Sequence, residues 1–395
     1  MPTAPPARSD NPDRPDRPDR PAEIRARVDG IATPAERALA IAADLLVHAR
    51  RPLVYGLAQA TVEAQRAAVA LAERLGAAID VAGSSAHAGA SRALRTLGAV
   101  TATLGEARAR AELLVFWGMD PDAVHPKFSE RYLASVPKSH APRTLAVDVG
   151  DARGPARADE RVAVEADTEI ELLWALRAGA RGRRIESVAG TAAGWADAAR
   201  ALARRLTSAP YAVLFFDAEP APARRDPLRA LALTALAAEV KAPARLRVVG
   251  VRAPGNAAGA EAVLTWQTGY PSAVDFAAGY PRYGPDEYEA ERLLARGEVD
   301  TVLLVGTVVP DDLSPVALAE LARVPKVLVA GGAATADARV AFETLPPDET
   351  PGSTYRMDGL ALRRRVERTS DLPTDEDVLR ALLEAVTGAP AGAPA

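Results

Sequence analysis

Apolar positions along the chain follow two alternating patterns. Short, nearly continuous apolar runs are typical of strands buried on both faces of a parallel sheet. Between most of these runs, apolar residues recur every three or four positions, which predicts helices. The sequence predicts strands at 51–57, 77–82, 113–117, 145–149, 162–164, 212–216, 246–251, 301–305 and 326–329, and helices that include 62–75, 168–177 and 195–206. This alternation favours an α/β architecture with at least two parallel-sheet layers.

The two ends of the chain depart from this pattern. Pro12 to Arg20 repeats Pro-Asp-Arg without any periodic apolar residue, so residues 1–30 are expected to be a disordered tail. Thr33, followed by Pro34 and Glu36, is typical of a capped helix start, and ordered structure is expected to begin there. Residues 371–395 are expected to form a helix and an Ala/Pro/Gly tail.

Composition narrows the possible functions. The chain has 395 residues, a net charge of −4 and no cysteine. Disulfides, thiolate-bound metals and an iron–sulfur cluster held by this chain are therefore excluded. No basic stripe points to nucleic acid or to an anionic membrane, and no apolar run approaches the roughly 18 residues of a membrane span. We expect a cytoplasmic protein.

Three of the four histidines favour ordinary structural roles. His48 lies at the end of a predicted helix, and His140 lies in a proline-flanked loop. His125 follows Asp120 and Asp122 just after a predicted strand, where an oxygen–nitrogen metal site is conceivable. Aspartates at strand ends more often form turns, and we prefer that interpretation.

His87 is the histidine whose position most favours a ligand pocket. It lies in a run of small residues, 83–89 (GSSAHAG), directly after a predicted strand, where ligand pockets of parallel sheets open. A serine hydrolase is poorly supported, because the sequence has no G-x-S-x-G elbow and shows no carboxylate partner for His87. The glycine-rich segment 255–260 matches neither a Walker loop nor G-x-G-x-x-G, and a tight loop entering a helix explains it.

Longer strings carry a family resemblance. They are residues 51–80, Trp117 to Pro121 with His125-Pro126 behind it, 261–283 (EAVLTWQTGYPSAVDFAAGYPRY) and 352–360 (GSTYRMDGL). In this order the sequence resembles the B subunit of formylmethanofuran dehydrogenase, and closely resembles its relative in the formyltransferase/hydrolase complex of bacterial one-carbon metabolism. The resemblance runs from about residue 35 to about residue 370.

The resemblance also implies a fold. The family is related to molybdopterin oxidoreductases, so we expect two parallel-sheet, three-layer α/β domains, one inserted in the other, without the iron–sulfur domain. Residues 35–85 and 285–370 would form the first, discontinuous domain, and 86–284 the inserted one.

Departures from the family pattern bear on function. Redox members begin with a cysteine-rich segment, where this chain has its Pro-Asp-Arg tail. They also place a cysteine or selenocysteine before a histidine to bind tungsten or molybdenum, whereas this chain has Ala86-His87. A methyl group cannot ligate a metal. We therefore expect this chain to bind no tungsten or molybdenum pterin and no iron–sulfur cluster.

The favoured hypothesis is a non-redox, structural subunit of a hetero-oligomeric formyltransferase/hydrolase complex. The resemblance implies formyltransferase-like and amidohydrolase-like partner chains, which would move a formyl group from tetrahydromethanopterin to a methanofuran-type carrier and hydrolyse it to formate. This chain itself would not be catalytic. Its old pocket would still be free to contact the carrier or a neighbouring subunit.

Two alternatives stay open. In one, His87 and Arg282 face the former metal centre and act directly in formyl transfer. In the other, a residual pterin or nucleotide pocket uses aromatic and charged side chains, namely Tyr280, Arg282, Tyr355, Arg356 and Asp358. A polar cavity or simple aromatic packing would explain the same residues without a ligand.

Overall fold

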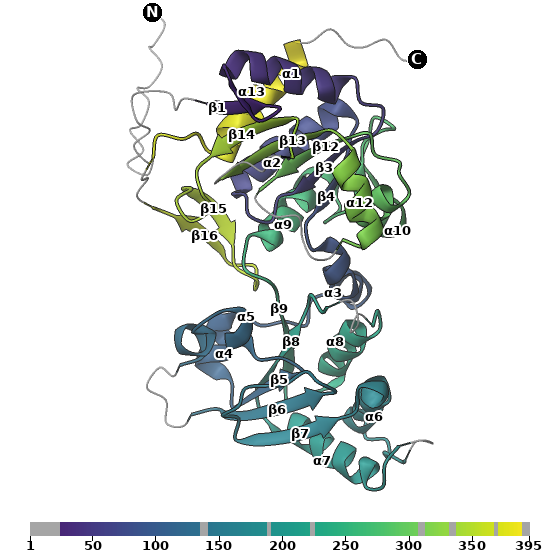
Figure 1. The fold of residues 1–395 in the computed structure, drawn as a ribbon. Coiled ribbons are helices and arrows are strands. Elements are labelled where there is room, and N and C mark those ends of the chain that lie inside the picture. The colour runs from purple at the N-terminus through teal and green to yellow at the C-terminus, as the bar shows by residue number, and fades with distance from the viewer. Residues whose placement is uncertain are drawn as a thin grey trace, which may run out of the picture.

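The structure is a computed structural model that describes residues 24–134, 141–187, 191–221, 226–306, 313–331, 337–366 and 370–388. Within them the chain forms a two-stranded hairpin and two larger sheets, one above the other in Figure 1, and each larger sheet is covered by helices. The predicted α/β fold with parallel sheets is confirmed. Every strand predicted from an apolar run is present.

The larger sheet has nine strands in the order β11-β10-β4-β3-β12-β13-β14-β1-β2. Its parallel centre consists of β4 (Ala78–Val81), β3 (Pro52–Gly56), β12 (Thr301–Val305), β13 (Lys326–Gly331) and β14 (Val340–Thr344). Antiparallel strands extend both edges: β10 (Val274–Asp275) with β11 (Arg282–Tyr283), and β1 (Arg25–Val28) with β2 (Ile31–Thr33).

Helices cover both faces of this sheet because side chains alternate along each strand. On β3, Val54 faces a core shared with α1 (Ala35–Val47), α2 (Val62–Leu75), α9 (Ala257–Thr268) and α13 (Asp375–Gly388). Leu53 and Tyr55 face the opposite side, where α11 (Ala290–Ala295) and α12 (Pro315–Arg323) pack. The short helix α10 (Pro285–Tyr288) precedes α11.

The smaller sheet has five parallel strands in the order β7-β6-β5-β8-β9. They are β7 (Glu160–Val164), β6 (Arg143–Val149), β5 (Leu113–Trp117), β8 (Ala212–Asp217) and β9 (Leu246–Val251). One face packs against α3 (Ser84–Leu97), α6 (Glu169–Ala180, after the 3-10 turn Ala166–Thr168), α7 (Trp195–Ser208) and α8 (Arg229–Glu239). The other face packs against α4 (Leu104–Arg110), α5 (Pro121–Val124) and the π-helix Ser129–Leu133.

A separate hairpin completes the fold. Among the described strands, β15 (Gly352–Tyr355) and β16 (Ala361–Arg364) pair only with each other, and they project from the larger unit toward α4 and α5 of the smaller one (Figure 1). The backbone N–H of Leu104, the first residue of α4, donates to the carboxylate of Asp358 in the hairpin turn at 2.8 Å. The hairpin therefore links the two units.

Three expectations about boundaries need correction. Residues 25–33 form β1 and β2, not part of a disordered tail, because β1 pairs with β14 more than 300 positions away, which local composition cannot reveal. Thr33 ends β2 and donates its hydroxyl to the carbonyl of Ile31, so it does not cap α1. The chain returns to the larger unit at about residue 256, well before residue 284, because α9 packs on α2 and β10 pairs with β4. Residues 1–23 and 389–395 lie outside the described part, and the division into separately folding domains stays a prediction.

Candidate functional site

His87 lies in the first turn of α3, which begins directly after β4. Gly83 precedes the helix with φ +85°, a left-handed conformation that glycine adopts without strain. Residues 84–89 of the small-residue run are therefore helical rather than a loop. This turn brings Nδ1 of His87 to 2.9 Å from Oε1 of Glu261 on α9. The histidine thus has a carboxylate partner that comes from 174 positions away.

Glu261 also binds Arg252, which follows β9. Nη1 of Arg252 lies 2.9 Å from Oε2 of Glu261, and its Nε donates to Glu219, after β8, at 2.6 Å. The second oxygen of Glu219 accepts the backbone N–H of Ala253 at 2.7 Å. All four side chains are largely buried. The cluster His87–Glu261–Arg252–Glu219 therefore joins the strand ends of the smaller unit to α9, which packs on the larger unit.

The electrostatics of the cluster favour its charged form. Burial acts to raise the pKa of Glu261, but the interactions with Arg252 and His87 outweigh it and lower that pKa to about 2. Burial likewise acts to lower the pKa of Arg252, whereas Glu261 and Glu219 raise it. Glu261 is therefore ionised throughout the physiological range.

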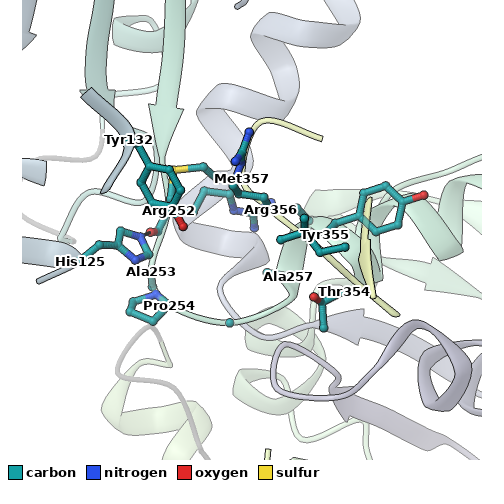
Figure 2. A pocket seen from close by; sticks show the side chains of 13 residues that line it. His125, Tyr132, Arg252, Ala253, Pro254, Ala257, Thr354, Tyr355, Arg356 and Met357 are labelled. Carbon is teal, nitrogen blue, oxygen red and sulfur yellow. Dashed lines mark hydrogen bonds between the residues drawn. The ribbon is translucent and has the colours of Figure 1, made fainter. Parts of the chain in front are cut away.

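A cavity of about 240 Å³ opens beside Arg252. Figure 2 shows His125 and Tyr132, from the smaller unit, on one side of it and Thr354 and Tyr355, from the hairpin, on the other. Arg356 lies between them, over the ring of Tyr132 at 5.3 Å. The cavity lies between the two units and is lined by both.

Two features make the cavity favourable for an anion. Nη2 of Arg252 is buried and has no hydrogen-bond partner among the described residues. The first residues of α9, Ala257 and Ala258, also line the cavity, and their helix has no side-chain cap. The side chain of Asn256 is unavailable as a cap because it bonds Ala60 and Tyr355 instead.

The residues of the expected pocket are only partly brought together. Tyr355 and Arg356 line the cavity, and Asp358 holds Arg356 through two bonds of 2.7 and 2.6 Å. Asp358 also accepts Leu104 N–H, and Arg356 lowers its pKa against the opposing effect of burial. His87 does not line the cavity. It binds Glu261, which in turn binds the cavity-lining residue Arg252.

Arg282 and Tyr280 lie elsewhere. Arg282 is in β11 at the edge of the larger sheet, where its Nη2 binds Asp275 at 2.6 Å. Neither Arg282 nor Tyr280 lines the cavity. Asp275 is fully buried and also binds Arg51, so the guanidinium of Arg282 is held there. Tyr280 is 62% exposed. The contacts of the described residues do not join Arg282 to His87, and the hypothesis that both face the former metal centre stays a prediction.

Two other histidines, His125 and His48, are each bonded to a backbone carbonyl. Nε2 of His125 bonds the carbonyl of Arg252 at 2.7 Å. Asp120 caps α5 through the N–H of Asp122, as expected of a turn residue. The described residues contain no cluster of three or more groups able to hold a metal. His48 ends α1 and bonds Asp44, and His140 lies outside the described residues.

Sequence reasoning missed Glu261, Arg252 and Glu219. Each is an ordinary charged residue in its local context, and nothing about its neighbours marks it as buried. Glu261 lies on α9 within a string that carries the resemblance, and this was the only signal for it. The glycine-rich segment before it does enter a helix, as expected.

The chain has close relatives among characterised proteins, although no protein-family model matches it. The B subunit of the tungsten-containing formylmethanofuran dehydrogenase 2 of Methanocaldococcus jannaschii is 31% identical over 365 residues, covering 89% of this chain and 83% of the relative. The B subunit of the formyltransferase/hydrolase complex of Methylorubrum extorquens is 31% identical over 284 residues, covering 70% of this chain and 73% of the relative.

Solved structures agree with this relationship. The formyltransferase/hydrolase complex of Methylorubrum extorquens, crystallised with methylofuran, contains a chain with a TM-score of 0.76 and 26% identity, over 92% of this chain and 98% of that one. Acetylene hydratase from Pelobacter acetylenicus has a TM-score of 0.57 at 12% identity, over 90% of this chain and 59% of that one. The second likeness concerns the fold alone.

The donor set does not fit a thiolate-bound tungsten or molybdenum ion. Ala86, at the position that the resemblance assigns to the metal ligand, presents a buried methyl group, and the whole chain lacks cysteine. The adjacent His87 is engaged by Glu261. Sequence identity over most of its length nevertheless shows that this chain belongs to the family of the formylmethanofuran dehydrogenase B subunit, which includes its counterpart in the formyltransferase/hydrolase complex.

Proposed function

We propose that this chain is a non-redox, structural subunit of a formyltransferase/hydrolase complex. The observation that carries this proposal is the methyl group of Ala86 beside His87, in a chain without cysteine. A redox subunit needs a metal ligand at this position, and neither a methyl group nor a histidine held by Glu261 can replace a thiolate. Formyl transfer and hydrolysis, in contrast, need no electron transfer.

The partners that we propose are a formyltransferase-like chain and an amidohydrolase-like chain. Together the subunits would move a formyl group from a tetrahydromethanopterin carrier to a methanofuran-type carrier and release formate by hydrolysis. The names of the relatives support this assignment, since one of them belongs to a complex with both activities in its name and a structure of that complex holds methylofuran. We further propose that this chain acts in the cytoplasm. The described residues include no helix that is long and apolar enough to cross a membrane.

Isolation of the tagged full-length chain from its native host tests the proposal. We expect stoichiometric recovery of the two partner chains, identified by mass spectrometry, and no tungsten or molybdenum by elemental analysis. Recovery of either metal in stoichiometric amount would contradict the non-redox assignment. A folded chain without partners would contradict the assignment to a complex.

A second candidate is a direct role in acyl transfer. The observation that favours it is the buried, unpartnered Nη2 of Arg252 beside a cavity, together with a histidine oriented by a carboxylate. Such groups are able to bind a formyl oxygen and accept a proton. Replacing His87 by alanine in the whole complex separates the candidates: a large loss of kcat supports this one, and unchanged turnover removes it.

A further inference from the structure

The β15–β16 hairpin is covered on one edge only. The backbone N–H groups of Ser353 and Tyr355 on β15 donate to Glu63 at 2.9 Å and to Asn256 at 2.7 Å, so side chains of α2 and of the α9 N-cap satisfy this edge. The outer edge of β16 pairs with no strand of the described chain. A two-stranded hairpin is marginally stable alone, and an open strand edge is ready to pair with another chain.

The hairpin is nevertheless held in place. Its turn is anchored to the smaller unit by the bond from Leu104 N–H to Asp358 and by the contact of Arg356 with the ring of Tyr132. The contact between Arg356 and Tyr132 lies beside the cavity in Figure 2. Because the strand edge is fixed before any partner arrives, little ordering entropy would be lost when a partner binds.

Large apolar side chains are exposed on the hairpin and beside it. Leu360 in the turn is 47% exposed, and Leu362 on β16, which also lines the cavity, is 42% exposed. Trp266 on α9 is 57% exposed and packs edge-on against Tyr355, with ring centres 5.9 Å apart. These three residues lie on or beside the hairpin, and grouped exposure of this kind marks protein interaction surfaces.

The charge beside these apolar groups is positive. Arg363 and Arg364 on β16 have no carboxylate partner in the part of the chain that the structure describes. The nearest acid along the hairpin, Asp358, is fully buried and already paired with Arg356. The chain as a whole has a net charge of −4, so this positive surface is local. Its complement is a negatively charged surface.

From these observations we infer that the hairpin surface, formed by the open edge of β16 with Leu360, Leu362, Arg363 and Arg364, is where another chain of the complex docks. The docking segment of that chain would be extended, would carry aspartate or glutamate opposite the two arginines, and would add a strand to the open edge of β16. The inference rests on the proposed function, because it takes the partner to be a different chain of the complex.

Charge reversal in the whole complex tests the surface. The variant R363E/R364E is compared with R183E/R204E, which reverses two exposed arginines of the smaller unit, and with L360S. All are expressed as tagged full-length chains in the native host, and the partner chains recovered with each are quantified by mass spectrometry. Urea unfolding of each purified chain shows whether it is folded. We expect R363E/R364E to lose partner about tenfold or more at moderate salt, and the control pair to match the wild type.

Hydrogen exchange gives a second measurement on the unmodified complex. The amides of β16 should exchange more slowly in the complex than in the free chain. Wild-type partner recovery with every variant, or unprotected β16 amides, would overturn the docking surface while leaving the proposed function intact. A wild-type chain that returns alone, or only with a second copy of itself, would overturn the proposed function and this surface together.

Discussion

Replacing Glu261 by glutamine removes one charge from the cluster that joins the two units while keeping the size of the side chain. Glu261 binds His87 and Arg252 at 2.9 Å each. Loss of one partner from a buried ion pair costs roughly 3–5 kcal/mol. The pKa of Glu261 falls from 4.5 to about 2, and at about 1.4 kcal/mol per pKa unit this corresponds to about 3 kcal/mol. We expect Glu261→Gln to lower the free energy of unfolding by about 3 kcal/mol at pH 7.

The contribution of Glu261 to the free energy of unfolding depends on pH in a direction that follows from its lowered pKa. Because the pKa of Glu261 is lower in the folded chain than in the unfolded chain, its contribution is fully present above about pH 4.5 and is lost as the pH falls toward 2. The glutamine variant has no such contribution to lose. Its stability curve should therefore approach that of the wild type as the pH falls below 4.5.

Urea unfolding of the full-length chain, followed by far-UV circular dichroism, measures the effect. Glu320→Gln serves as the matched control, since Glu320 pairs with Arg323 at the surface at 3.0 Å and such pairs contribute at most about 1 kcal/mol. If Glu261→Gln is no more destabilising than this control at pH 7, the buried cluster does not stabilise the fold.

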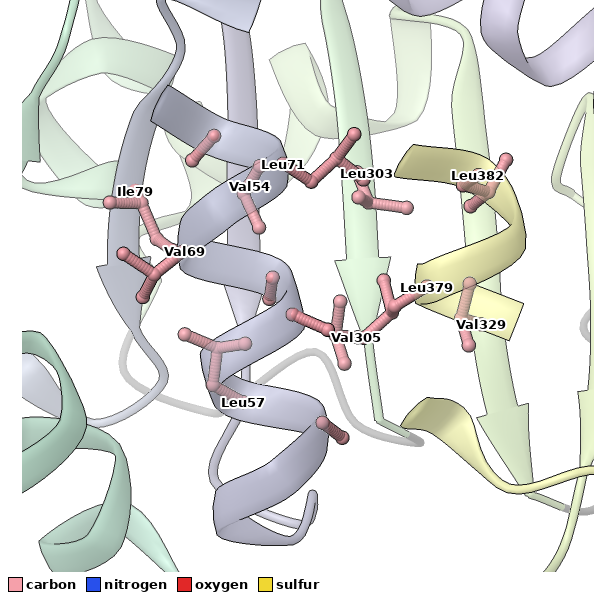
Figure 3. Packing of buried hydrophobic residues seen from close by; sticks show 14 of the residues in the cluster. Val54, Leu57, Val69, Leu71, Ile79, Leu303, Val305, Val329, Leu379 and Leu382 are labelled. Carbon is pink, nitrogen blue, oxygen red and sulfur yellow. The ribbon is translucent and has the colours of Figure 1, made fainter. Parts of the chain in front are cut away.

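Three further predictions concern stability, and each is measured by urea unfolding. Burial and nearby Asp80 raise the pKa of Glu289 to about 7, so its ionisation lowers the free energy of unfolding as the pH rises from about 4.5 to 7. Glu289→Gln should raise the free energy of unfolding at pH 8 by on the order of 1–2 kcal/mol and flatten its pH dependence, and an unchanged pH dependence would contradict this prediction. Gly56 has φ +114°, and an added Cβ would lie 2.2 Å from the carbonyl oxygen of Val305. Gly56→Ala should therefore lower the free energy of unfolding by more than about 2 kcal/mol, whereas Gly182→Ala, with open space around it, should lower it less. Leu379 of α13 is fully buried and lies near Val305 and Val329 in Figure 3, so Leu379→Ala should cost roughly 2–5 kcal/mol, and a cost below about 1 kcal/mol would show that α13 is not part of this core.

The sequence by itself determined the strands of the parallel sheets, except β14 (Val340–Thr344), which was not predicted, and the absence of thiolate chemistry. Strands such as 113–117 and 301–305 are buried on both faces, so nearly every position must be apolar and the pattern is visible locally. The helix at 62–75 was visible from its apolar periodicity. In the structure Thr61 caps this helix and Gly76 ends it in a left-handed conformation. Ala86, in a chain without cysteine, needed no structure to argue against a thiolate-bound metal.

Only the tertiary structure decided which distant residues meet. β1 becomes a strand by pairing with β14, and the edge strands β10 and β11 are two residues each, too short for a periodic signal. Glu261 reaches His87 because α9 and α3 approach each other from different units, and a charged residue is stable in that buried place only through partners distant in sequence. Arg282 is held by Asp275, its partner seven positions away on the paired strand β10, and the hypothesis that it faces the former metal centre with His87 stays a prediction. Local pattern reports which face of an element is buried, whereas the partner of a buried charge depends on how the chain folds back on itself.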